Sequence, residues 1–297
     1  MLQRPNVCVL CAVNALAGLA ILPYITEVRS DRAKIMFENW GGSIRNDREE
    51  IESDPELKAL IKHPERILPG NGVRIGDEWC GIDADLHLLH EIGNVRSVSL
   101  YSPRIADESL RMLIGLPDLQ EIWISPDTSI SPRGLALLGQ MKTLREVSLM
   151  TPQISDRTCA ALGGLPAMQR LYLGSAENVS VFGLLSLLRS NSLRDVVLGG
   201  VQPEVLKALA DSRLSHNTSV RRIRWFASGL DAPHIVQLCR HLDKLELLHL
   251  GYSDLPPNAV EQIRIALPGV TVQHSRIDGE RDLSQWNCFG PRDLFGK

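Results

Sequence analysis

Residues able to recognise another molecule recur at regular intervals between Val95 and Val272. Seven segments there share one spacing of apolar residues, and two positions in each segment carry polar, charged or aromatic side chains. Counted from the first apolar residue, position +4 gives Ser99, Trp123, Ser148, Tyr172, Val197, Arg224 and His249, and position +2 gives Ser97, Glu121, Glu146, Arg170, Asp195, Arg222 and Leu247. Trp, Tyr and Arg most often anchor protein interfaces, so this pattern predicts binding rather than catalysis.

These positions predict a binding surface for a protein or peptide of unknown identity. The predicted partner-binding residues are Trp123, Tyr172, Arg222, Arg224, Glu121, Glu146, Arg170 and His249. Trp123 and Tyr172 would lie two strands apart, roughly 10 Å at a strand spacing of ~4.8 Å, so one partner can bridge them. The early positions are acidic and the late ones basic, which suits a dipolar partner. The alternative is a solvated face whose charges pair with each other and bind nothing.

A second kind of chemistry is suggested by His87 and His90, which are three residues apart on an expected helix with Cys80 upstream. This spacing can bring two imidazoles together on a metal ion. Leu88 and Leu89 between them favour ordinary helix packing, so we assign no metal and no cofactor. The sequence has no GxSxG, P-loop, HExxH or dinucleotide-binding glycine pattern, and we expect no enzymatic activity.

The composition narrows the classes of partner. The chain has 297 residues, a net charge of −3 and a pI near 6.3, so it lacks the basic excess of a nucleic-acid-binding domain. Hydrophobic residues make up 44% and aromatic residues 5%, which favours a core of aliphatic side chains. The six cysteines form neither a disulfide framework nor paired CxxC zinc ligands, and we expect them to be small buried side chains.

The run from Val7 to Ile25 contains no charged residue over 19 positions. A helix of this length nearly matches the roughly 30 Å hydrocarbon core of a bilayer, which predicts a single-pass N-terminal membrane anchor. A cleaved signal peptide is an alternative, because Ala15-Leu16-Ala17 resembles a cleavage site, and the protein would then be secreted. A buried helix is a third possibility. Basic residues flank both ends, so they do not fix the orientation.

The apolar spacing predicts the elements that position the candidate residues. The period is 24 or 25 residues in the clearest copies, which begin at Val95, Leu119, Leu144 and Met168; weaker copies begin at Leu193, Val220 and Leu245. Alternating residues after each start predict a short strand, and apolar residues three or four apart then predict a helix. Expected helix N-caps are Asp107, Ser131, Asp156 and Asp231.

This pattern resembles the leucine-rich repeat family, in particular bacterial proteins that combine such repeats with an N-terminal hydrophobic segment. The resemblance covers about residues 73–273. It implies an α/β solenoid, an arc or horseshoe with parallel strands on the concave face and helices on the convex face, preceded by a hydrophobic helix. The frequent turn asparagine of the family is missing, and the Leu193 copy carries an insertion near Ser212 to Ser219.

We divide the chain into an anchor or signal helix with its stalk (1–34), an N-terminal cap (35–72), the repeats (73–274) and a C-terminal tail or cap (275–297). In the tail, Leu283, Trp286, Phe289 and Leu294 either cover the last repeat or remain loose. The expected function is a non-catalytic interaction module, tethered to a membrane, that binds a partner on its concave face. The alternatives are a structural spacer or envelope scaffold without a ligand, and a metal-binding or enzymatic protein.

Overall fold

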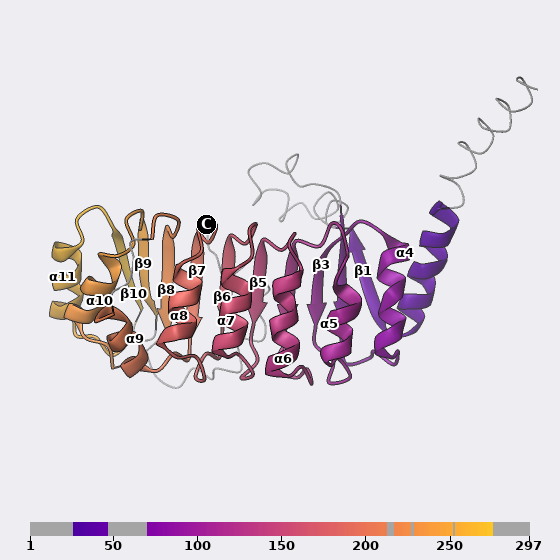
Figure 1. Cartoon of the computed structure of the whole chain (residues 1–297), viewed down its shortest axis with the longest axis horizontal. Coiled ribbons are helices and arrows are strands. Elements are labelled where there is room, and N and C mark those ends of the chain that lie inside the picture. Colours follow the sequence, from indigo (N-terminus) through magenta and orange to yellow (C-terminus); the bar gives the residue numbers. More distant parts are fainter. Residues whose placement is uncertain (1–25, 47–69, 213–216, 227–228, 252, 276–297) are drawn as a thin grey trace, which may run out of the picture.

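A computed structural model describes residues 26–46, 70–212, 217–226, 229–251 and 253–275 of the chain. Within these ranges, strands and helical segments alternate along the sequence and build one elongated α/β solenoid (Figure 1). This confirms the α/β solenoid predicted from the apolar repeat. Residues 1–25 of the predicted anchor and stalk, residues 47–69 of the predicted cap and residues 276–297 of the predicted tail lie outside the described residues.

In the part of the chain that the structure describes, ten strands form one sheet, and their order in space is their order in the sequence. β1 pairs antiparallel with β2, and the later neighbours are parallel. The strands are β1 (Gly42–Asn46), β2 (Asn71–Ile75), β3 (Val95–Leu100), β4 (Glu121–Ile124), β5 (Glu146–Leu149), β6 (Arg170–Leu173), β7 (Asp195–Gly199), β8 (Arg222–Phe226), β9 (Leu247–Gly251) and β10 (Thr271–Ser275). Equivalent positions of successive repeats therefore lie side by side.

The helical segments follow the strands and lie on one face of the sheet (Figure 1). They are η2 (Asp83–His87), α4 (Leu88–Ile92), α5 (Asp107–Leu113), α6 (Pro132–Leu135), η3 (Ala136–Gln140), α7 (Asp156–Gly163), α8 (Val181–Leu188), α9 (Pro203–Ala210), α10 (Ala232–Cys239) and α11 (Pro257–Ala266). We call the opposite face of the sheet the strand face. It corresponds to the predicted concave face.

The main core fills the space between the sheet and the helices. In the layer of β5, Leu144, Val147 and Leu149 are fully buried, and Cys159 and Leu162 of α7 are fully buried against them. Each aliphatic side chain buried in this way contributes roughly 1.5–3 kcal/mol. The apolar spacing of the sequence is therefore the spacing of one continuous core that runs from layer to layer.

The N-terminal end of the sheet is closed by a helix and an antiparallel strand. Residues 26–39 are helical, which crosses the predicted boundary between stalk and cap, and Phe37 packs on Trp79 with ring centroids 5.1 Å apart. Gly41 follows with φ at +84°, and a Cβ there would lie 2.2 Å from the Glu78 carbonyl oxygen, so only glycine fits. The second half of this helix thus packs on the first layers instead of standing free.

None of the helices in the described ranges combines the length and the apolar character needed to cross a bilayer. The segment predicted to do so, residues 7–25, lies outside those ranges.

Two of the four predicted N-caps are confirmed. The Ser131 hydroxyl accepts a hydrogen bond from the backbone N–H of Gly134, and the Asp231 carboxylate accepts one from that of His234. The prediction was wrong for Asp107 and Asp156, which are the first residues of α5 and α7, one position inside the helix. The carboxylates of Asp107 and Asp156 bond to the neighbouring layer instead.

Asp107 and Asp156 each bind the serine that begins the next helix. Asp107 accepts bonds from the Ser131 N–H (2.8 Å) and O–H (2.6 Å), and Asp156 accepts bonds from the Ser180 N–H (2.7 Å) and O–H (2.5 Å). We call these two contacts the Asp–Ser ties. A Cβ at Gly183 would lie only 2.4 Å from an oxygen of Asp156, so the second tie requires a glycine there.

Candidate functional site on the strand face

The strand register places the eight predicted partner-binding residues in two rows. The first row holds Ser97, Glu121, Glu146, Arg170, Asp195, Arg222 and Leu247, and the second row holds Ser99, Trp123, Ser148, Tyr172, Val197, Arg224, His249 and Gln273. Trp123, Tyr172 and Val197 are buried, yet they do not belong to the contact cluster of the main core. They form a separate apolar surface on the strand face.

The charges of the first row pair along the row. Arg170 forms an ion pair with Glu146 at 2.5 Å, and Arg222 binds Asp195 through two parallel bonds of 2.7 and 2.8 Å. The bidentate geometry and the nearby carboxylate raise the pKa of Arg222, against a smaller opposing effect of burial. The alternative in which charges on this face pair with each other therefore holds for these four residues.

Pairing weakens the predicted contrast between an acidic and a basic end. At the early end Glu121 and Glu146 face one arginine, Arg170, which leaves a single negative charge. At the late end Arg221 lies 2.6 Å from Glu246, and Arg222 is bonded to Asp195. With Arg224 included, this end has three arginines and two carboxylates, a net charge of +1 for these five side chains.

Burial changes systematically along the second row. Gln273 on β10 is exposed, and His249 and Arg224 are partly exposed. The next four residues, Val197, Tyr172, Ser148 and Trp123, keep only 1–3% of their surface in contact with solvent, and Ser99 on β3 is again partly exposed. The predicted aromatic anchors, Trp123 and Tyr172, are therefore not open surface side chains in this structure.

Two adjacent polar groups in the buried centre have unused bonding capacity. Among the described residues, neither Trp123 Nε1 nor Ser148 Oγ has a hydrogen-bond partner, although the two residues are neighbours across β4 and β5. A buried polar group without a partner costs roughly 1–3 kcal/mol. The Trp123 N–H can therefore donate a hydrogen bond, and the Ser148 hydroxyl can donate or accept one, if another group approaches the strand face.

Trp123 also takes part in a stack that the prediction did not include. The Tyr101 ring meets the Trp123 ring edge to face with centroids 4.5 Å apart, and the Arg74 guanidinium lies 4.5 Å above Tyr101. Both contacts are of the kind that stabilises aromatic surfaces. Tyr101 was detectable at position +6 of the first regular copy, whereas Arg74 lies in the irregular strand before that copy.

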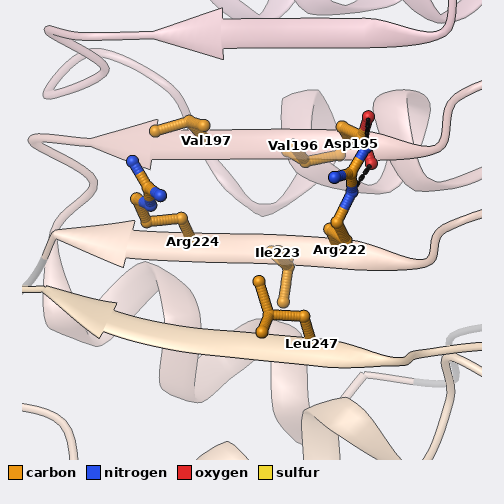
Figure 2. Close-up of a pocket in the computed structure, with 7 residues that line it drawn as sticks. All are labelled: Asp195, Val196, Val197, Arg222, Ile223, Arg224 and Leu247. Atoms are coloured by element: carbon orange, nitrogen blue, oxygen red, sulfur yellow. Dashed lines mark hydrogen bonds and ion pairs between the residues drawn. The ribbon is translucent and has the colours of Figure 1, made fainter. Parts of the chain in front are cut away.

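The accessible part of the site is a small hollow on β7, β8 and β9. Figure 2 shows Arg222 and Arg224 projecting from β8, with Val197, Asp195 and Leu247 around them. About 30 Å³ of the hollow is open, which is enough to hold a water molecule or a small polar group. Burial lowers the pKa of Arg224, while the nearby Tyr172 acts in the opposite direction. The hollow suits a small polar group that bonds to guanidinium N–H donors.

Two further ionisable groups of the second row are held neutral. Burial raises the pKa of Tyr172 to about 12, although the Arg224 charge opposes this shift. Burial lowers the pKa of His249 to about 4, and the charges of Arg224 and His274 act in the same direction. The His249 ring bonds through Nε2 to the Ser275 hydroxyl at 3.0 Å. At neutral pH this part of the row therefore carries charge on Arg224 but not on Tyr172 or His249.

The residues of the alternative metal site lie in separate interactions. A ring nitrogen of His87 bonds to the Ala84 carbonyl at 2.7 Å, one of His90 bonds to the Met112 carbonyl at 3.0 Å, and Cys80 is exposed. Within the described ranges, no group of three or more His, Cys, Asp or Glu side chains is arranged to hold a metal ion.

Comparisons with known proteins give only distant similarities. No protein-family model matches the chain, and no curated protein matches it. Similar solved structures include the yeast complex of Rad7 and Elc1 (13% identity, 97% of this chain, 100% of that chain, TM-score 0.35). The TLR13–ssRNA13 complex has 14% identity over 64% of this chain and 31% of that chain, with a TM-score of 0.39.

A leucine-rich repeat protein of Leptospira interrogans has 16% identity over 63% of this chain and 50% of that chain, with a TM-score of 0.36. These identities and TM-scores carry no conclusion about function. The α/β solenoid fold is assigned from the strand order, the register and the helices of this chain.

Proposed function

We propose that this protein is a non-catalytic interaction module that binds a protein segment along the strand face. The observation that carries the proposal is the pair Arg222 and Arg224 on β8, which project on the same side over one hollow. The side chain of Arg222 is 46% exposed despite its bonds to Asp195, so N–H groups remain available. An acidic side chain or a chain-terminal carboxylate of the partner would bind there.

The size of the hollow favours a protein segment over a small molecule. Small-molecule pockets usually enclose about 300–1,000 Å³, whereas this hollow has about 30 Å³ open. A protein segment can instead cross several strands and contact both rows.

The membrane tether is part of this proposal and depends on the uncharged run from Val7 to Ile25. A single-pass helix there would tether the protein to a membrane. Release of the full-length protein from membranes by an alkaline carbonate wash would contradict insertion. A shorter mature chain in the soluble fraction would instead support signal cleavage and secretion.

Partner capture tests the binding site. Proteins bound from a membrane extract are compared between wild type, Arg224→Ala, and Arg222→Ala/Arg224→Ala. A matched control, Arg133→Ala/Arg157→Ala, removes two exposed arginines from helices on the opposite side. We expect Arg224→Ala to weaken capture and the double strand-face variant to abolish it, while the helix-side control retains it.

Arg224→Ala keeps the Arg222–Asp195 pair and so separates binding from folding. Thermal melts of all variants confirm that the fold is retained. Identical partner sets for the wild type and both strand-face variants would exclude this binding site. That outcome would favour the structural alternative, a spacer whose strand-face residues tolerate substitution.

A further inference from the structure

Three neighbouring helices carry an exposed row of residues that differs from the corresponding residues on either side. The second residue of each helix is Glu108 in α5, Arg133 in α6, Arg157 in α7, Phe182 in α8 and Glu204 in α9. Arg133, Arg157 and Phe182 are all exposed, and Phe182 keeps 77% of its surface in contact with solvent. We call these three residues the helix-side patch.

The residues of the helix-side patch do not stabilise the helices that carry them. The helix dipole disfavours a positive charge in the first turn, whereas Glu108 and Glu204 carry the sign that it favours. The side chains of Arg133 and Arg157 have neither an ion pair nor a hydrogen bond among the described residues. An exposed phenylalanine ring likewise gains nothing from folding. Contact with another molecule therefore explains the patch better than folding does.

Positive charge dominates the helices of the patch. The segments α6, η3 and α7, and α8 with its C-cap, hold three arginines and one acidic residue, which are Arg133, Arg157, Arg189 and Asp156. The Asp156 carboxylate is already bonded to the N–H and O–H of Ser180. The exposed acids nearest in sequence, Asp127 and Glu177, belong to the turns before α6 and α8. A negatively charged surface would therefore meet an excess of arginine over these helices.

The helix on the N-terminal side of the patch has a different arrangement of charges. In α5, Glu108 and Arg111 form an ion pair one turn apart. The last helix, α11, has the same kind of pair between Glu261 and Arg264 at 3.3 Å. Charges on these helices compensate each other locally, so the uncompensated arginines are a specific feature of the middle helices.

Small and apolar side chains accompany the arginines. Ala160 in α7 is exposed, and Leu137 in η3 and Leu185 in α8 are partly exposed. Neighbouring helices pack ~10 Å apart, so the patch extends roughly 20 Å from α6 to α8. It therefore suits an extended surface rather than one small ligand.

We propose that the helix-side patch binds the surface of an anionic lipid bilayer. The planar guanidinium groups of Arg133 and Arg157 would bond to the phosphate and carboxylate groups of the lipids. Phe182 would enter the boundary between the headgroups and the acyl chains. Arginine combined with an exposed aromatic ring is typical of protein surfaces that lie on membranes.

A bilayer fits this patch better than a protein does. The residues of the patch protrude, and lipids can rearrange around protruding side chains without a complementary pocket. Two copies of the chain that met symmetrically through the patch would bring arginines of like charge together, which disfavours self-association. A protein partner and a second copy are nevertheless outcomes that the experiment below distinguishes.

This inference is independent of partner binding on the strand face. The helices lie on the opposite face of the sheet (Figure 1), so a bilayer against the patch would leave the hollow at Arg222 and Arg224 accessible. The proposed tether would bring the patch close to lipid, but the charge pattern of α6 to α8 does not depend on it.

The test uses a fluorescent reporter beside the patch in the full-length chain. Cys8, Cys11, Cys80 and Cys288 are replaced by serine; Cys159 and Cys239 stay, because burial raises the pKa of each thiol to about 12. An environment-sensitive fluorophore is attached to Ala160→Cys in α7. A second preparation carries it on Gln273→Cys, which is exposed on the strand face.

Emission is recorded on vesicles isolated by flotation, made of phosphatidylcholine alone or with roughly 30% phosphatidylserine. We expect the Ala160→Cys reporter to shift to shorter wavelength on the anionic vesicles only, and the Gln273→Cys reporter to stay unchanged on both. Salt at about 0.5 M should reduce the shift, because it screens the attraction between arginine and lipid. Attachment through another part of the chain would float every variant alike, so the local reporter decides.

Two variants test the residues of the patch, Arg133→Gln/Arg157→Gln and Phe182→Ser. The matched control is Arg145→Gln/Arg194→Gln, which removes two exposed arginines directly before β5 and β7. We expect each patch variant to raise the lipid concentration for a half-maximal shift roughly tenfold, and the control to resemble wild type. Thermal melts confirm that each variant is folded.

Equal shifts on neutral and anionic vesicles would overturn the proposal, and so would equal responses of the patch variants and the control. A shift without lipid that grows with protein concentration would identify a second copy as the occupant. A shift that requires an added protein extract would identify a protein. Either result would also overturn the proposal. The reporter responds to lipid and partner capture to protein, so failure of one leaves the other intact.

Discussion

We call the side of the solenoid where the helices begin, at residues such as Ser131 and Ser180, the helix-start edge. This edge and the strand face use the same kinds of residues for different purposes. At the helix-start edge, Ser131 and Ser180 are each bonded on both sides, to an aspartate of the preceding layer and to a backbone N–H of their own helix. On the strand face, the Ser148 hydroxyl has no hydrogen-bond partner among the described residues although it is 1% exposed.

The difference shows which polar groups serve folding and which remain available for binding. A serine whose bonds are complete stabilises the layer that contains it, and a partner gains little from it. A buried serine without a partner costs stability until another group approaches. The first kind is found where the layers join, and the second kind where we place the binding surface.

Removing the carboxylate of a tie should give the largest effect. We expect Asp156→Ala to lower the free energy of unfolding by about 3 kcal/mol, because two bonds to an ionised group are lost and Ser180 is left without its acceptor. Urea unfolding followed by circular dichroism measures this. Asp118→Ala, which removes an exposed carboxylate, should stay within about 0.5 kcal/mol of wild type. Equal effects would contradict the importance of the tie.

Filling the space beside a tie should have the next largest effect. In Gly183→Ala the new Cβ would meet Asp156 Oδ1 at 2.4 Å and Val179 Cγ1 at 2.8 Å. We expect a net loss of about 2 kcal/mol, because the clash exceeds the roughly 1 kcal/mol that alanine gains over glycine in a helix. Gly76→Ala has open space around the new Cβ and serves as the control in the same unfolding assay.

Lowering the pH should destabilise the strand face through His249. Its pKa of about 4 in the folded chain lies below its usual value of ~6.5, so the unfolded chain binds the proton first. The stability that the neutral His249 ring contributes to the folded chain is fully present above about pH 6.5 and is lost as the pH falls towards 4. For this partly exposed ring we expect a loss of about 1 kcal/mol. Thermal melts of wild type and His249→Gln at pH 7, 5.5 and 4 measure it, and parallel curves would contradict it.

Removing the unpartnered hydroxyl should have the smallest effect and the opposite sign. We expect Ser148→Ala to leave stability unchanged or to raise it by up to about 1 kcal/mol, because a buried polar group without a described partner disappears. Ser131→Ala at the helix-start edge should instead lower stability by about 1 kcal/mol through loss of an N-cap. Similar losses at both serines would remove the distinction between the two regions.

The sequence was sufficient to predict the features of the fold that depend on the local spacing of apolar residues. The apolar period gave the strands, the helices and the residue-by-residue alignment of the two rows. The pairs Arg170–Glu146 and Arg222–Asp195 were also within reach, because register neighbours of opposite charge in one row will meet. We predicted a contrast between an acidic and a basic end because we counted the charge of each row position separately and did not consider pairing between neighbouring positions.

Other features depend on contacts that the repeat pattern does not contain. Asp107 and Asp156 were predicted to cap their own helices, since a single helix offers no sign that a carboxylate will bind the next layer. The burial of Trp123 and Tyr172 also could not be predicted. Position +4 fixes which face a side chain occupies, whereas its exposure depends on what lies over that face.

The Asp–Ser ties have a mechanical consequence. They join α5 to α6 and α7 to α8 by charge-assisted bonds in addition to the shared core, and a bond from the Ser109 hydroxyl to Asp83 also joins α5 to η2. In a solenoid, each layer's stability depends on its contacts with its neighbours. Under a pulling force applied at the two ends, the layers of α7 and α8 should therefore yield together, with an extension step of about 50 residues where a single repeat would give about 25.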